Sequence, residues 1–277
     1  MKLRTNFAVL SVLIVALFVV AVFGNSSPEQ LLAATAAATA APAQPSTVLN
    51  VSCNQLPDFA ALKAALTKAR HDKNGGLNVD MWGVIVDRDG TVCAVAFTGA
   101  NRGAQFPGSR LIAAEKAFTG NALSQPGVAL STANLYSPSQ PGGSLFGVIT
   151  LIPLDPAVAY GGNAAQYGQT DDPMVGKKTG GFVVFAGGLA LYDKNKQPIG
   201  GLGVSGDTSC ADQNIAWKTR SFLKLDFVPF GVSATGDDNI VYDIKDGKSA
   251  GGYGHPECSP DSTTIGNALP KDFPISH

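Results

Sequence analysis

Two apolar runs separated by a tight-turn signal constrain the fold of this chain more than any other segment. Residues 81–97 read MWGVIVDRDGTVCAVAF, and Asp89-Gly90 is a dipeptide typical of a type I′ turn between antiparallel strands. Apolar side chains occupy both faces of these strands, whereas a sheet with one wet face alternates apolar and polar residues. The hairpin is therefore predicted to lie centrally in a sheet that helices cover.

Helices are predicted on both sides of this hairpin in the chain. Apolar residues recur at helical spacing between Asp58 and His71, and the Asp58 carboxylate can cap the first turn. A later helix, capped by Thr208 or Ser209, is expected to run to about Leu225. Both would pack one apolar face on the sheet.

A helix is also predicted directly after the hairpin. It begins at Ser109, a good capping residue, and continues to about Leu123. A short helix is expected near residues 128–136. The predicted core stripe of the longer helix consists of Leu111, Ala114, Phe118 and Ala122.

Further strands are predicted at residues 182–185, 189–192 and 199–205. Residues 137–181 are irregular and rich in Gly, Pro and Asn, with one strand-like run at 146–152. An irregular segment of this length inside a domain is typical of a binding loop or an oligomer arm. Strands joined by tight turns indicate an antiparallel sheet, so the fold class is α+β, with helices flanking the sheet.

The folded domain is predicted to span residues 53–228. Residues 229–277 show no sustained periodicity except a strand-like patch at 239–244, so they are expected to form an irregular tail tied to the domain by a disulfide.

The N-terminus is typical of a targeting segment. Lys2 and Arg4 precede an apolar run that ends at Gly24, which is the pattern of a secretory signal. The run, about 18 residues long, would also suffice for an uncleaved membrane anchor. Residues 25–52, rich in Ala, Thr and Pro, are predicted to be a linker. The domain is therefore expected in the periplasm or outside the cell, and at a membrane only through an uncleaved N-terminal segment.

Four cysteines are expected to form disulfides, because an even number in an exported chain favours pairing. Four cysteines allow three pairings. The pairs Cys53–Cys93 and Cys210–Cys258 are preferred, since each would fasten a terminal extension to a core element. Four separate buried thiols are the alternative.

Charge and motifs exclude several classes of function. Lys plus Arg number 20 and Asp plus Glu 21, a net charge of −1, so binding to nucleic acid is not expected. Residues 201–206 match G-x-G-x-x-G, but a parallel βαβ unit does not surround them, and close backbone packing is the preferred interpretation. Ser205 does not lie in a G-x-S-x-G motif, and three scattered histidines give no metal-ligand cluster, so neither a serine hydrolase nor a tight metal site is predicted.

A few polar residues are candidates for ligand contact. Lys116 lies mid-helix with Ser109 and Thr119 on its side, so it either extends into solvent or lines a cavity as a cation. Arg110 is similar. His71, near a helix C-terminus, is either a favourable cation there or an axial metal ligand.

Two blocks of sequence together resemble the GlcG/HbpS-like haem-binding family, which is also similar to the C-terminal domain of PduO-type proteins. One comprises Val86-Asp87-Arg88-Asp89-Gly90 followed by Ala113-Ala114-Glu115-Lys116-Ala117-Phe118-Thr119. The other extends from Gly187-Gly188 to Gly206. The resemblance covers residues 58–225. It implies an antiparallel sheet of about five strands with profilin-like layering, self-association, and binding of haem or another planar tetrapyrrole.

The resemblance also implies where a ligand would lie. Cations on the helix would meet haem propionates, hydroxyls would hydrogen-bond, and glycines would allow close approach. By matched position the resemblance points to Lys116 and Thr119. The other candidate contacts come from the residues themselves: Ser109, Arg110, Tyr136, Gly187, Gly188 and Ser205, with His71 as an axial iron ligand. Tyr136 suits either a ligand contact or a subunit contact. A binding protein is the preferred reading. The alternatives are a redox-protective or tetrapyrrole-degrading enzyme using the same site, and a structural oligomer without a small ligand.

Overall fold

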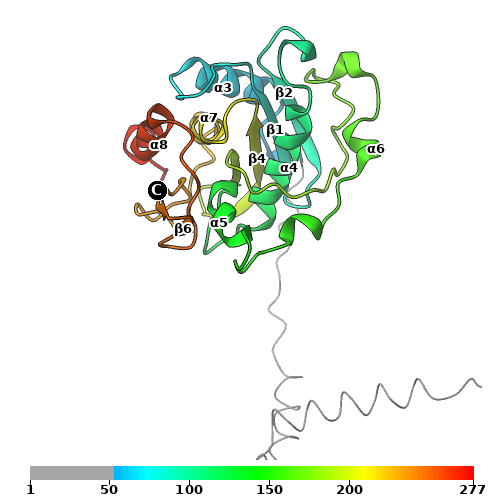
Figure 1. The fold of residues 1–277 in the computed structure, drawn as a ribbon. Helices are drawn as coiled ribbons and strands as arrows, with labels where there is room; N and C mark the ends of the chain where they lie inside the picture. Colours follow the sequence, from blue (N-terminus) through cyan, green and yellow to red (C-terminus); the bar gives the residue numbers. More distant parts are fainter. Residues whose placement is uncertain (1–52) are drawn as a thin grey trace, which may run out of the picture. The chain divides into compact units, whose positions relative to one another are not determined.

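A four-stranded antiparallel sheet lies at the centre of the described part of the chain, residues 53–277 of a computed structural model (Figure 1). Its strand order is β2-β1-β4-β3. The predicted signal or anchor at residues 1–24 and the predicted linker at 25–52 lie outside the described residues. Within residues 53–277, helices of the length and hydropathy needed to cross a membrane are absent.

The strands of this sheet follow one another in two pairs, β1–β2 and β3–β4, with helices before, between and after the pairs, as is typical of an α+β protein. Short helical turns lie between these elements. The longer connections carry most of these turns. In chain order the elements are η1 Cys53–Gln55, α3 Phe59–His71, β1 Trp82–Asp87, β2 Val92–Phe97, η2 Arg102–Ala104, α4 Ser109–Ala122, η3 Thr132–Leu135, α5 Tyr136–Ser139, η4 Val148–Thr150, α6 Pro156–Ala159, η5 Ala164–Gln166, β3 Gly188–Tyr192, β4 Pro198–Ser205, α7 Ser209–Phe222, β5 Ile244–Lys245, β6 Lys248–Ser249 and α8 Pro260–Asp272.

The hairpin of β1 and β2 is present and nearly fully buried, as its apolar faces predict. Only β1 is central, however, because β2 forms an edge of the sheet. Its turn differs from the predicted type I′. Positive φ occurs at Gly90 (+79°) but not at Asp89, and the register shifts between Ile85 and Val86. The turn is therefore closed by a left-handed glycine with a bulge. The Asp87 carboxylate reinforces it by accepting hydrogen bonds from the backbone N–H groups of residues 89 and 91.

Helices cover both faces of the sheet, which gives three layers (Figure 1). Helix α4 lies on one face, where Val84 and Val86 pack against Ala113 and Ala117. Helices α3 and α7 lie on the other, and there Ile85 joins the larger core cluster. Alternate residues of β1 thus point to opposite helical layers.

Glycines in β4 allow α4 to approach the sheet closely. A Cβ atom placed on Gly203 would lie less than 3.0 Å from the backbone oxygen of Ala113, and one on Gly201 would crowd Ala117 in the same way. A Cβ on Gly120 of α4 would lie 2.9 Å from the Leu189 nitrogen. The G-x-G-x-x-G motif therefore serves helix–sheet packing, which agrees with the preferred interpretation of the sequence.

Of the helix caps predicted at Asp58 and Ser109, the structure contains the first but not the second. Asp58 caps α3, with its Oδ1 accepting the Ala61 N–H at 2.9 Å, as expected. Ser109 does not cap α4: Gly108 occupies the N-cap position and Ser109 is the first, buried helical residue. Phe118 is only half-buried, because the face of α4 that meets the sheet is made of small residues.

Two predicted strands do not form in the described residues, so the sheet has four strands rather than about five. Residues 146–152 form the short turn η4 instead. Residues 182–185 run beside α4, where the Val183 N–H donates to the Thr119 hydroxyl at 3.0 Å, and the next residue, Ala186, donates to Ser209. Side chains on helices thus take the hydrogen bonds that a neighbouring strand would have taken.

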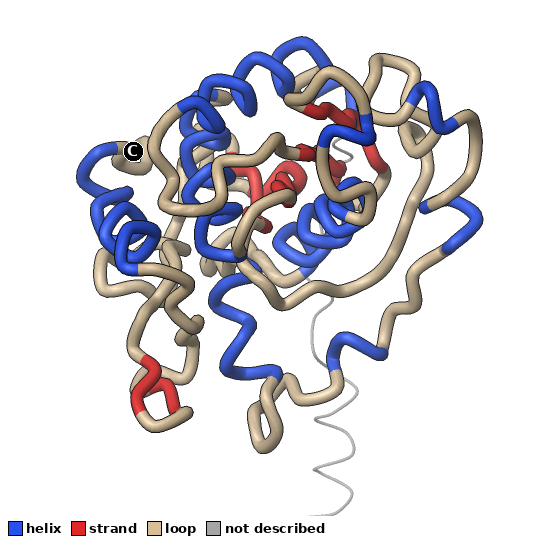
Figure 2. The backbone as a smooth tube through the Cα atoms, turned by 45° about the horizontal axis from the view of Figure 1, so that its top comes forward, coloured by secondary structure: helices blue, strands red, loops and turns tan. Residues whose placement is uncertain are grey.

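The tail, predicted to be irregular, contains the helix α8, which packs on α7 (Figure 2). Ser259 caps this helix and Pro260 occupies its first turn, a combination that favours a helix start. The Trp217 indole N–H donates to the Phe273 carbonyl at 2.9 Å. The strand-like patch at 239–244 contributes only Ile244, to the two-residue strand β5.

Two disulfides join distant parts of this fold, with the pairing that the sequence analysis prefers. Cys53 bonds to Cys93 of β2, and Cys210 of α7 bonds to Cys258 of the tail. The tail is thereby attached covalently at the N-terminal end of α7.

Gly203→Ala is expected to lower the free energy of unfolding by about 3 kcal/mol, because the added methyl group would force α4 away from β4. The control is Gly127→Ala, where a Cβ meets no atom within 4 Å, and there the change should stay below about 0.5 kcal/mol. Urea unfolding followed by circular dichroism measures both. Equal stabilities of the two variants would contradict the close-packing account.

Candidate functional site

Lys116 forms a buried ion pair with Asp212 of α7. Its ammonium lies 2.6 Å from the Asp212 carboxylate and also donates to the Val204 carbonyl at 3.2 Å. Both side chains are at most 3% exposed. Burial raises the pKa of the Asp212 carboxyl to about 6, although Lys116 and the Asp207 N–H both act to lower it. Lys116 therefore does not extend into solvent, and its charge already has a partner.

The glycine pair beside Lys116 is packed against protein atoms. A Cβ on Gly187 would lie 3.1 Å from the Lys116 ammonium, and one on Gly188 would lie 2.5 Å from Thr132 Cγ2. The Gly187 N–H donates to Gln213, and the Gly188 N–H donates to Thr132, both at 2.9 Å. In this conformation the space next to these glycines is filled by the chain itself.

Arg110 is likewise paired. Its guanidinium binds the Asp172 carboxylate through two nitrogens, donates to the Ala159 carbonyl at 2.9 Å and lies 3.8 Å from the centre of the Tyr167 ring. These partners belong to the long segment between α4 and β3. Arg110 thus fastens that segment to α4.

The remaining predicted contacts on α4 and β4 are also internal. Ser109 and Ser205 are buried, and Ser205 pairs with Trp82 within the sheet. The buried Thr119 hydroxyl donates to the Glu115 carbonyl at 2.7 Å and accepts from Val183. The structure therefore places these residues on one helix and the adjoining strand, where Lys116, Arg110 and Thr119 already bind groups of the protein itself.

His71 lies elsewhere, at the exposed end of α3, on the wall of a cavity of about 560 Å³. The cations Arg70 and Lys73 border the same cavity. Its other side is formed by Ile215 of α7 and by residues of α8. An imidazole and two cations thus meet at one concave surface of mixed polarity, together with the carboxylates of Asp72, Asp207 and Asp261.

Tyr136 packs against a histidine that the sequence analysis did not single out. Its ring centre lies 5.3 Å from that of His255, which comes from the tail and is 3% exposed. His255 Nε2 lies 3.0 Å from the Ser209 hydroxyl, and Nδ1 lies 2.7 Å from the Pro256 carbonyl. Burial lowers the pKa of His255 to about 4. Sequence spacing gave no signal for this contact, because Ser209 and His255 are 46 residues apart.

Glu115 is a half-buried carboxyl on the outer side of α4. It packs on the Gly181 backbone, close to the position that a Cβ would take there. Burial raises the pKa of Glu115 to about 7.

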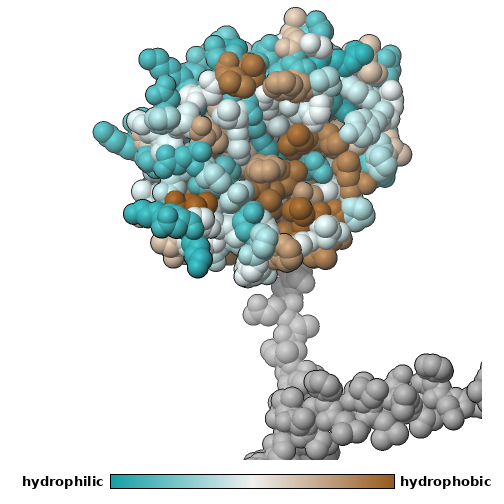
Figure 3. Space-filling model, viewed as in Figure 1, coloured by the Kyte–Doolittle hydropathy of each residue, from teal (hydrophilic) through white to brown (hydrophobic). Residues whose placement is uncertain are grey.

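Exposed apolar side chains gather on the face seen in Figure 3. The segment between α5 and α6 contains three apolar side chains that are each more than half exposed, Phe146, Ile149 and Leu151.

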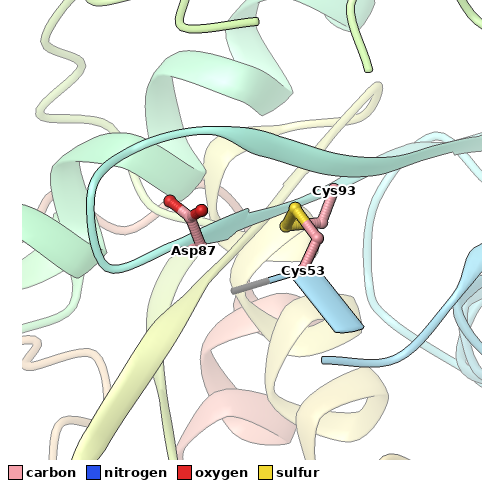
Figure 4. Close-up of side chains that lie close together, drawn as sticks. All are labelled: Cys53, Asp87 and Cys93. Atoms are coloured by element: carbon pink, nitrogen blue, oxygen red, sulfur yellow. A yellow bond between two sulfur atoms is a disulfide. The ribbon is translucent and has the colours of Figure 1, made fainter. Parts of the chain in front are cut away.

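One cluster of the described residues has the composition of a metal site but not its chemistry. Ligand atoms of Cys53, Asp87 and Cys93 lie within 4.8 Å of one another (Figure 4). The two sulfurs are bonded to each other, so neither is a thiolate that could bind a metal ion. The arrangement acts as a cross-link next to the hairpin turn.

Comparison with known proteins gives one family and several structures. Residues 59–220 match the model of the family described as haem degrading protein HbpS-like. A Klebsiella pneumoniae protein, ORFY, is 25% identical, with a TM-score of 0.41 over 60% of this chain and 90% of that one. A PduOC haem complex is 25% identical (TM-score 0.40, 60% and 94% covered), and a double mutant of Streptomyces reticuli HbpS is 18% identical (0.37, 65% and 93%). No curated protein matches.

Asp212→Ala is expected to lower the free energy of unfolding by about 3–5 kcal/mol, because it leaves the Lys116 charge buried without a partner. The double variant Lys116→Met/Asp212→Leu removes both charges and should recover most of that loss. Chemical unfolding of the three proteins at pH 7 gives the comparison. A loss of unfolding free energy below about 1 kcal/mol in Asp212→Ala is the value typical of a surface ion pair and would contradict this account.

Glu115→Gln is expected to stabilise the fold at pH 8 by about 1 kcal/mol and to have little effect at pH 4. With its pKa raised from 4.5 to about 7, the folded carboxyl holds more protons than the unfolded one between these values. The stabilisation that comes from this extra protonation of the folded state is therefore lost as pH rises from 4.5 to about 7. Urea midpoints at both pH values test this, with the exposed Glu257→Gln as the control for removing one negative charge.

Proposed function

The chain belongs to the HbpS-like family, and on that basis we propose that it binds haem or a closely related tetrapyrrole. The family model spans more than half of the chain and includes the whole central sheet. The description of the family as haem-degrading supports a tetrapyrrole as the ligand class.

The cavity at the end of α3 is the proposed site. His71 offers an imidazole, which is a common axial ligand of haem iron. The exposed Lys73 offers positive charge to a propionate, and Ile215 offers apolar contact. Arg70 adds a second charge, although its guanidinium already donates to the Asn78 and Val79 carbonyls. The observation that carries this placement is an exposed histidine on a cavity of about 560 Å³, whose charged lining consists of Arg70, Lys73, Asp72, Asp207 and Asp261. Bound haem would supply an iron centre there, with His71 as its protein ligand.

The set around Lys116 is the second possible location, and it fits haem less well. A propionate could reach the Lys116 ammonium only by displacing the Asp212 carboxylate. That exchange would leave Asp212 buried without its partner, which is costly. Haem at this place would therefore require α4 and α7 to separate locally.

Export is part of the proposal. Two disulfides among the described residues favour an oxidising compartment, because cytosolic thiols are kept reduced. Self-association, which would cover exposed side chains such as Phe146 and Leu151, is proposed as well.

Haem degradation is the second candidate function, and the family description favours it. It is distinguished from simple binding by an irreversible loss of the Soret band when a reductant and oxygen are added to the loaded protein. A stable spectrum under these conditions would leave binding as the function.

Titration of the full chain with haemin should give a saturable Soret shift. His71→Ala is expected to weaken binding at least tenfold, since the loss of one good ligand contact costs about 1.4 kcal/mol or more. His277→Ala, which changes an exposed histidine at the C-terminus, is the matched control and should bind as the wild type does. Difference spectra at constant protein concentration measure all three proteins.

The same titration separates the two locations. Unchanged affinity in His71→Ala, together with a loss in Lys116→Ala, would move the site to α4. A linear, unsaturable absorbance change in the wild type would remove haem binding as the function.

A further inference from the structure

The hydrogen bond between Ser209 and His255 has the chemistry of a nucleophile and its base. It is the only serine–histidine hydrogen bond in residues 53–277, at 3.0 Å. The Pro256 carbonyl can only accept, so the His255 Nδ1 carries the proton that lies 2.7 Å from it. Nε2 is then the unprotonated nitrogen, and the Ser209 hydroxyl donates to it. An imidazole oriented by a third group and accepting from a serine is the arrangement of an activated nucleophile.

The imidazole is held in its neutral, proton-accepting form. His255 is 3% exposed, and burial lowers its pKa to about 4. At neutral pH the imidazole is therefore unprotonated, although the same burial makes it a weaker base than an exposed imidazole. The Pro256 carbonyl orients the imidazole, as an aspartate does in a Ser-His-Asp triad.

The position of Ser209 in α7 favours negative charge on its oxygen. It is the first residue of a 14-residue helix, where the backbone dipoles present their positive end. Thr208 satisfies the N–H groups of Ala211 and Asp212, and the Cys258 sulfur accepts from the third N–H, that of Cys210. The N–H of Ser209 itself has no acceptor among the described residues, so it can donate to an oxyanion.

The surrounding structure fixes this pair in place. The disulfide Cys210–Cys258 joins the two segments one residue from Ser209 and three residues from His255. Tyr136 packs on the imidazole ring from α5. Such constraint from neighbouring groups is what a catalytic pair needs, because its geometry must hold before the substrate arrives.

The Ser209 hydroxyl oxygen keeps one acceptor position unused. Ser209 is half-buried, and its oxygen accepts one hydrogen bond, from the Ala186 N–H at 2.9 Å. A hydroxyl oxygen has two lone pairs, so one is left for attack. Phe185, which precedes Ala186 in the chain, is an apolar side chain that is 55% exposed.

We propose that Ser209 and His255 form a catalytic pair that hydrolyses small esters with an apolar acyl group. Ser209 Oγ forms a bond to the ester carbonyl carbon while its proton passes to His255 Nε2. The bond to the alcohol oxygen then breaks, and that oxygen takes the proton from Nε2. Water hydrolyses the acyl-serine by the same proton route, which releases the carboxylic acid and restores the hydroxyl. This activity is independent of haem and of the cavity at His71.

The test uses the full-length protein, a fluorophosphonate probe and p-nitrophenyl butyrate. The probe phosphonylates activated serines with loss of fluoride, and mass spectrometry of peptides identifies the labelled residue. The expected result is a label on Ser209 and release of p-nitrophenolate. Ser209→Ala and His255→Gln should each lower the hydrolysis rate by about 100-fold or more, which is the contribution typical of a general base.

The matched control is Ser137→Ala. Ser137 also joins the tail to the core, through a hydrogen bond of 2.6 Å to the Gly254 carbonyl, but no histidine contacts it. Its rate should stay within about twofold of the wild type. His255→Gln keeps an acceptor for Ser209 and cannot accept the proton, so a folded His255→Gln protein isolates the chemistry from the tail contact. No label on Ser209, or equal labelling in His255→Gln and wild type, would overturn the proposal.

Discussion

The close contact between α4 and the glycines of β4 is the constraint on which the other features depend. Because β4 lacks side chains at residues 201 and 203, the helix backbone approaches the sheet directly. This approach carries Lys116 across the end of β4 to reach Asp212 of α7, on the opposite layer. It also presents Thr119 to the chain entering β3, which then hydrogen-bonds to the helix rather than to a strand. The close approach of α4 to β4 thus accounts both for the Lys116–Asp212 ion pair and for the absence of a strand at residues 182–185.

Local signals in the sequence predicted those elements whose stabilising contacts are local or periodic. The buried hairpin, the Asp58 cap and the Thr208 cap are of this kind. Residues 146–152 were mistaken for a strand because an apolar run fits an exposed turn equally well when no neighbour is known. Ser259 and Pro260 are residues that favour a helix start, but helix α8 was not predicted because few of its residues form an apolar face.

The candidate site shows the limit of such reasoning more sharply. Lys116 stood out as a charge in an apolar helix, but the sequence could not show that Asp212, 96 residues later, neutralises it. The same holds for Arg110 and Asp172, 62 residues apart. The sequence left His71 as either a cation at a helix end or an axial metal ligand. Only the fold shows that His71 and residues of α8 line the same cavity. Charges that look available in a sequence are therefore often already paired in the folded chain.

The two disulfides have a consequence for a chain exposed to proteases. Cys210 and Cys258 close a covalent ring around residues 211–257, which contains the exposed β5–β6 turn at Asp246 and Gly247. A cut at that turn would open the ring without releasing α8, since the bridge still holds the C-terminal piece on α7. Cys53–Cys93 likewise protects the link between η1 and the sheet against a cut between them. The two disulfides thus keep the pieces of the domain joined after a cut in the backbone at either place.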